Sequence, residues 1–223
     1  YDAIRGIFRT GASLSTKFYK VFDAATDRWG LDINRLRHLI TPSVSYFYNH
    51  TPTFTSNDLD SFDGIDSRDI GHGLNFSLEN KLQTKRSGNV VELLRAVIGT
   101  DFALKENPSK GGFNIINTDI DFRPLDRITF YFDSTYDTRE EYLTTANFDL
   151  SINGGSRWTA DIGKRWNRVV DDQVTTQFTY KINSKWALRT YNRFDVRSAL
   201  HKEQEFSLRR DLHEWTMDIN FNE

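Results

Sequence analysis

In the segment VTTQFTYKIN (residues 174–183), mostly apolar side chains alternate with polar ones. Its even positions are Val174, Thr176, Phe178, Tyr180 and Ile182, and its odd positions carry only threonine, glutamine, lysine and asparagine. Successive side chains of a β-strand point to opposite faces, so the segment predicts a strand with one apolar and one polar face. A helix would mix the two sets on every side.

The same two-residue period recurs along the chain and predicts about twelve strands. The segment VELLRAVIGTDFAL (91–104) is apolar on both faces in its first half, but Gly99 and the β-branched valines favour a strand there. Most segments have about 9–11 residues, the length of a tilted strand that crosses a bilayer. The expected strands are 8–18, 36–48, 74–82, 91–104, 116–122, 128–136, 146–152, 158–166, 174–182, 186–194, 206–212 and 215–221.

The connections between these segments alternate between tight turns and longer polar links. Outer-membrane barrels have short periplasmic turns and longer outer loops. The pattern therefore predicts an all-β, antiparallel up-and-down transmembrane β-barrel, in which the first strand runs inward and the twelfth outward. The expected tight turns are RPLDR (123–127), NGGS (153–156), NSK (183–185) and RDLH (210–213), and the longer links are 50–72, 105–112, 137–143, 167–173 and 197–203.

The composition agrees with strands that need only one apolar face. Apolar residues make up 38% of the chain and aromatic residues 14%, against about 45–50% apolar in an average globular protein. A net charge of −2 gives no nucleic-acid footprint, and the absence of cysteine excludes thiolate metal sites. The first residues, YDAIRGIFRT, lack a signal peptide's apolar core. We therefore expect residues 1–223 to be one barrel segment, incomplete at both ends, from a longer precursor.

Charges of both signs recur on the polar face of the expected strands. A water-filled or plugged barrel interior tolerates such charges, whereas lipid does not. We therefore expect these side chains to face the lumen, along a transport path or against a plug. They are Arg37, Lys81, Arg95, Asp101, Asp119, Asp121, Asp133, Asp149, Asp161, Lys181, Arg189 and Arg193.

Aromatic residues gather near the expected strand ends. Trp and Tyr favour the membrane interface, where a ring has one apolar and one hydrated end. We therefore predict two aromatic girdles, although ordinary strand aromatics of a soluble sandwich are the alternative interpretation. The residues concerned are Tyr46, Tyr48, Tyr136, Trp158, Trp166, Trp186 and Trp215.

Catalytic and metal sites have little support. The acidic loop 58–69 resembles a calcium loop, but Phe62 stands where the third acidic ligand belongs, so we expect a solvated outer loop and no bound metal. His38, His72, His201 and His213 have no histidine at i+4 that would pair with them for zinc. Neither the carboxylate pairs 140–141 and 171–172 nor Ser43 and Ser45 show a catalytic context. We expect no enzyme activity and no cofactor.

Four segments, in order, resemble the C-terminal barrel domain of the LPS-assembly outer-membrane protein family, LptD or OstA. They are RLRHLITPSVSYFY (35–48), VELLRAVIG (91–99), IDFRPLDRITFYFDSTYD (120–137) and RRDLHEWTMDINF (209–221). Strands of different barrels have similar sequences, so the resemblance depends on all four segments occurring in the same order as in the family. Its most characteristic residues are Arg37, His38, Pro42, Arg123, Pro124, Asp211, Leu212, His213 and Trp215.

The resemblance implies transport of lipopolysaccharide to the outer leaflet of a bacterial outer membrane. It further implies a barrel of about 26 strands, of which this chain would be a part, an LptE-type plug lipoprotein in the lumen, and periplasmic LPS-bridge proteins reached through an N-terminal domain. Glu214 stands where the family often has a cysteine, which puts oxidative control of assembly in doubt. A generic porin or solute channel fits the alternation equally well, and a soluble all-β binding module is the third alternative.

Overall fold

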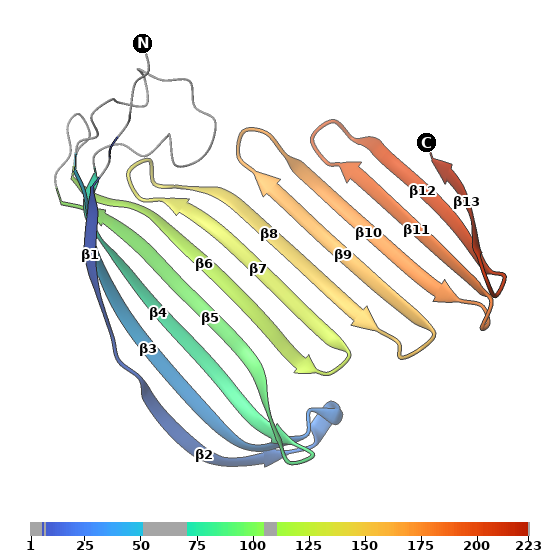
Figure 1. Cartoon of the computed structure of the whole chain (residues 1–223), viewed down its shortest axis with the longest axis horizontal. Coiled ribbons are helices and arrows are strands. Elements are labelled where there is room, and N and C mark those ends of the chain that lie inside the picture. Colours follow the sequence, from blue (N-terminus) through green and yellow to red (C-terminus); the bar gives the residue numbers. More distant parts are fainter. Residues whose placement is uncertain (1–5, 7, 51–70, 105–110, 223) are drawn as a thin grey trace.

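The computed structural model is a single antiparallel sheet, and it describes residues 6, 8–50, 71–104 and 111–222 (Figure 1). From β3 onward each strand pairs with the next in sequence, while β1 and β2 both pair with β3. The strands are β1 (Arg9–Ser15), β2 (Phe18–Thr26), β3 (Ile33–Asn49), β4 (Gly71–Arg86), β5 (Asn89–Ala103), β6 (Gly112–Leu125), β7 (Ile128–Asp137), β8 (Tyr142–Asn153), β9 (Trp158–Asn167), β10 (Asp172–Lys181), β11 (Trp186–Asp195), β12 (Leu200–Asp211) and β13 (Thr216–Asn222).

The sheet confirms the predicted all-β antiparallel meander. Residues 91–104, which were open to a helical interpretation, lie almost entirely in β5. The only helical segment in the described part of the chain is the short 3-10 turn η1 (Arg28–Gly30), and no helix there is long and apolar enough to span a membrane. The sheet is open, because β1 and β13 lie at its opposite edges and share no ladder (Figure 1).

The structure has thirteen strands where about twelve were expected, because the stretch that follows the predicted first strand (8–18) forms a further strand, β2. Ser15 faces Ser43 and Phe18 faces Ile40, so β1 and β2 keep a single register along β3. The gap between them lies opposite Pro42, whose carbonyl accepts a 3.2 Å hydrogen bond from the Thr16 N–H. Proline has no N–H to return that bond, so the ladder is interrupted there. On its other side β3 pairs with β4 without a break.

The expected contrast in connection length holds only in part. The links after β7, β9 and β11 are four-residue connections, 138–141, 168–171 and 196–199, because the strands run further than their alternation indicates. A tight turn at 87–88, between β4 and β5, was not predicted. More of the sequence separates β3 from β4 and β5 from β6, and the ends of these strands at Asn49, Gly71, Ala103 and Gly112 lie at the end of the sheet opposite to that turn.

The single layer has almost no buried core. Within the described residues, the only buried hydrophobic side chains are Leu93 and Ala103. Large apolar side chains in mid-sheet stay exposed, including Ile98 at 48% and Ile162 at 45%. A soluble sandwich would cover such side chains with a second sheet. The exposed apolar face therefore argues against the soluble-module alternative.

One end of the sheet is tied together by the buried side chain of Arg86, which is 9% exposed. Its guanidinium donates to Asp126 Oδ1 at 2.8 Å, to the Leu31 carbonyl at 3.0 Å and to the Pro124 carbonyl. Asp126 lies in the β6–β7 turn, Pro124 lies at the end of β6, and Leu31 belongs to the segment after η1, which lies beside the β4–β5 turn in Figure 1. Arg86 therefore fastens three consecutive connections to one another.

Replacing Arg86 with methionine should lower the free energy of unfolding by about 1–3 kcal/mol, because it leaves the acceptors of a buried donor without a partner. The matched control is Arg209→Met, which removes an exposed pair with Asp218 and should cost at most about 1 kcal/mol. Urea unfolding in detergent micelles, followed by tryptophan fluorescence, measures both. If the two variants lose the same free energy of unfolding, Arg86 stabilises the protein no more than an exposed charge does.

Candidate functional site on the polar face of the sheet

The strand register brings all the predicted lumen residues onto one face. Residues directly opposite each other in neighbouring strands share a face. Lys81 faces Arg95, Arg95 faces Asp121, and Tyr131 continues this row between Asp121 and Asp149. Alternation within each strand adds the rest. The face, called the polar face below, carries Arg37, Lys81, Arg95, Asp101, Asp119, Asp121, Asp133, Asp149, Asp161, Lys181, Arg189 and Arg193.

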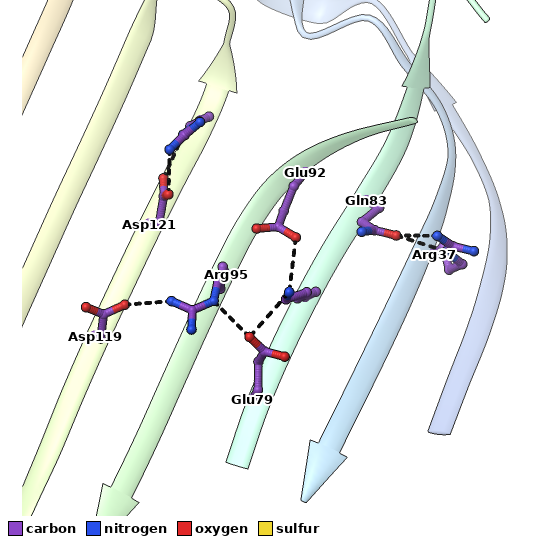
Figure 2. A network of polar contacts seen from close by, with 9 residues as sticks. Arg37, Glu79, Gln83, Glu92, Arg95, Asp119 and Asp121 are labelled. Carbon is purple, nitrogen blue, oxygen red and sulfur yellow. Dashed lines mark hydrogen bonds and ion pairs between the residues drawn. The ribbon is translucent and has the colours of Figure 1, made fainter. Parts of the chain in front are cut away.

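A network of opposite charges crosses β4, β5 and β6 on the polar face. Figure 2 shows Arg95 between two carboxylates, donating to Glu79 at 2.8 Å and to Asp119 at 3.0 Å. Lys81 lies 3.3 Å from Glu79 and 3.7 Å from Glu92. Each charge in the network therefore has an opposite charge on its own or the next strand.

Polar pairs extend the network to both sides. On β3, Arg37 donates to Gln83 Oε1 at 3.0 and 2.5 Å (Figure 2). On β6, Arg123 donates to both carboxylate oxygens of Asp121, at 2.9 and 2.7 Å, and to the Tyr131 hydroxyl at 2.9 Å. Exposed pairs of this kind add about 0–1 kcal/mol each. Their main effect is a hydrated, charge-balanced surface.

The remaining predicted residues mostly have partners toward β13. Asp149 accepts two hydrogen bonds from Arg165, at 2.8 and 2.7 Å, whereas Asp161 accepts one from the Ser151 hydroxyl at 2.5 Å and has no cation beside it among the described residues. The Lys181 side chain has no hydrogen bond or ion pair among the described residues, although its backbone N–H donates to the Arg157 carbonyl at 2.7 Å. The other pairs are Asp133 with Asn147 at 2.9 Å, Arg189 with Gln177 at 2.9 Å and Arg193 with Glu203 at 3.2 Å.

The opposite face is apolar and carries aromatic residues at both ends. Tyr46, Tyr48, Tyr136 and Trp166 lie near the end with the long links, and Trp158, Trp186 and Trp215 near the end with the tight turns. Arg210 lies 4.9 Å from the ring centre of Trp186, one of these aromatic residues. Aromatic rings at both borders of an apolar band match the interfaces of a bilayer.

The residues behind the family resemblance are distributed over both faces and the turns. His38 lies on the apolar face, with Nε2 3.3 Å from Asn80 Oδ1. The RDLH segment forms a turn in which Asp211 Oδ1 accepts from the His213 N–H at 2.9 Å, His213 has a φ of +83°, and Leu212 donates to the Trp215 carbonyl. These turn residues have a structural role and do not gather into a site.

Nothing in the described residues assembles into a catalytic or metal centre. No group of three or more His, Asp or Glu side chains there could hold a metal ion. Ser45 accepts a hydrogen bond from Ser13 at 2.9 Å and has no histidine beside it among the described side chains. The acidic loop 58–69 lies outside the described residues.

Several partners of the charged residues were missed from the sequence. Glu79 with Lys81, and Asp121 with Arg123, are two residues apart on one strand and so point to one face. That spacing was available as a signal. Arg165 and Glu203 could not be assigned, because their partners lie on neighbouring strands and depend on the register.

A single antiparallel meander with one exposed apolar face, aromatic borders and a charge-balanced polar face defines the outer-membrane β-barrel class. Within that class, residues 4–93 match the family described as LptD protein. The chain is therefore similar to the LptD family over that segment. The search of curated proteins found no match.

Arginine placed on the two faces of one strand should have unequal effects. Phe76 in β4 lies on the apolar face and is 39% exposed, and an arginine there should cost about 2–4 kcal/mol in a bilayer. Its neighbour Ser77 lies on the polar face opposite Gly99, so Ser77→Arg should cost less than about 0.5 kcal/mol. Unfolding in lipid vesicles compares the two variants. Similar losses in the free energy of unfolding would contradict the assignment of the two faces.

Proposed function

We propose that this chain forms part of the barrel that moves lipopolysaccharide into the outer leaflet of a bacterial outer membrane. The match of residues 4–93 to the LptD family carries the proposal, since that family transports lipopolysaccharide at the outer membrane. Transport needs no catalytic group, and binding to lipopolysaccharide needs no cofactor.

The two faces of the sheet support this role. The apolar face, with its aromatic borders, suits contact with hydrocarbon chains and headgroups. The polar face would then line the lumen, where its paired charges remain hydrated. Arg37, Lys81, Arg95, Asp119 and Asp133 would lie along the transport path or against a plug, together with the rest of the polar face.

An open sheet needs further strands before it can span a bilayer. Backbone groups at a free sheet edge have no partner in hydrocarbon, so stable β-structures in membranes are closed. We propose that residues 1–223 are one barrel segment, and that β1, β2 and β13 pair with strands outside it. An LptE-type plug lipoprotein would contact the polar face, and periplasmic LPS-bridge proteins would deliver the lipid through an N-terminal domain.

Depletion of the protein in its source bacterium tests the proposed function. Newly made lipopolysaccharide, followed by pulse labelling, should disappear from the cell surface and accumulate before the outer leaflet, because the barrel is its exit. An antibody against its sugar chain on intact cells measures the surface fraction. The gene supplied in trans should restore it.

The same experiment separates transport from the solute-channel alternative. Depletion of a channel would leave surface lipopolysaccharide unchanged and would slow the uptake of small solutes. That outcome would contradict the proposal and favour a porin.

A further inference from the structure

We propose that the apolar face binds the headgroup of an anionic phospholipid near its tight-turn end, through Lys20, His38 and Asn80. These three residues, called the headgroup cluster below, interrupt a face that is mostly apolar along β2, β3 and β4. The inference goes beyond lipopolysaccharide transport. It rests on the proposed function only for the orientation, in which the tight turns lie at the periplasmic side.

The strand register brings the headgroup cluster together. Lys20 of β2 lies directly opposite His38 of β3, and residues so placed have Cβ atoms about 4.5–5.5 Å apart. The His38 Nε2 lies 3.3 Å from Asn80 Oδ1 of β4. With Nε2 as the donor, the amide N–H groups of Asn80 stay available, and they have no acceptor among the described residues. Three neighbouring strands thus present an ammonium group, an imidazole and an amide side by side.

The charge of Lys20 has no counterion in the described part of the chain. Its Nζ lies 5.2 Å from the ring centre of Phe22, and none of the described carboxylates pairs with it. By contrast, Lys164, on the same face of β9, is paired with Asp172. A cation that faces lipid is costly unless it reaches the polar headgroups. A lipid phosphate would supply Lys20 with the opposite charge that Asp172 supplies to Lys164.

The headgroup cluster lies at the depth of the lipid headgroups. Tyr46 and Tyr48 mark the opposite border of the apolar band on β3, eight and ten residues after His38. A tilted strand crosses the hydrocarbon in about 9–11 residues. His38 is therefore at the other border, where lipid phosphates lie. With the tight turns toward the periplasm, these phosphates belong to the inner leaflet of the outer membrane.

An apolar hollow lies between the headgroup cluster and the middle of the bilayer. His38 and Pro42 share one face of β3, and Pro42 lies about 13 Å further along the strand. A hollow of about 350 Å³ opens beside Pro42, and its lining includes Phe76, Leu78 and Ile98. One leaflet of a hydrocarbon core is about 15 Å thick. An acyl chain whose phosphate lies at the cluster therefore reaches the hollow.

The cluster and the hollow together specify the ligand class. The phosphate of a glycerophospholipid accepts charge-assisted hydrogen bonds from an ammonium group and further bonds from an amide. Its acyl chain fills the hollow, a contact that a free phosphate ion would lack. A headgroup with a quaternary ammonium would bring a second cation close to Lys20 and be disfavoured. An anionic phospholipid such as phosphatidylglycerol therefore fits best.

Native mass spectrometry of the full-length protein, purified in a non-ionic detergent, measures the binding. The probes are phosphatidylglycerol and phosphatidylcholine of the same acyl length, and phosphatidylglycerol should stay bound to a larger fraction of the protein. Lys20→Gln should weaken phosphatidylglycerol binding by about fivefold, the effect of one basic residue near a lipid phosphate. Lys20→Arg keeps the charge and should keep the binding. Glycerophosphoglycerol, which has no acyl chains, should not displace the lipid.

Lys164→Gln is the matched control. It removes a lysine from the same face, but one that already has a carboxylate partner. Its phosphatidylglycerol binding should therefore equal that of the unmodified protein. Thermal unfolding in detergent verifies that all the variants are folded.

The outcomes separate this inference from the proposed function. Equal binding of the two phospholipids, equal losses in the Lys20→Gln and Lys164→Gln variants, or displacement by glycerophosphoglycerol would overturn the headgroup site. Loss of surface lipopolysaccharide on depletion, without selective phospholipid binding, would refute the site and leave the transport role intact. Selective binding by a protein whose depletion leaves lipopolysaccharide at the surface would support the site and refute transport.

Discussion

The need to pair every backbone N–H and C=O within the protein governs this structure. Hydrocarbon offers no water to these groups, so a chain that enters it must form continuous ladders. From β3 to β13 each strand pairs with its sequence neighbour. The missing donor of Pro42 is directed toward the edge strands β1 and β2, and the ladder with β4 continues past it. The interruption thus falls at the margin of the sheet.

Regular ladders in mid-strand also keep the two faces distinct. A one-residue slip would turn every side chain of a strand to the other face. From β3 to β13 the register shifts fall near strand ends, as at Leu82/Gln83, Thr100/Phe102 and Arg193/Phe194. The strand centres therefore preserve one alternation across the sheet, and this separates a hydrated surface from a lipid-compatible one.

The polar face is itself divided into two regions. Over β4 to β6 opposite charges pair with one another, with Arg95 between Glu79 and Asp119 (Figure 2). Over β8 to β10 the side chains of Thr175 and Asp149 approach Gly163 closely, and one Asp161 oxygen has no partner among the described residues. The first region is a set of paired, hydrated charges, whereas the second leaves one carboxylate oxygen unpaired.

The sequence by itself determined most of the strands, their two faces and part of the charged set, because alternation is a local property of each strand. It predicted β5 despite its apolar first half and placed Arg37 through Arg193 on one face. It did not determine where the strands end. Three links were therefore predicted to be longer than they are, and the turn at 87–88 was missed. Only the tertiary structure decided which residues lie opposite one another, since register depends on how neighbouring strands align. The burial of Arg86 among three connections and the close approach of Thr175 and Asp149 to Gly163 both depend on that alignment, which the alternation within a single strand does not reveal.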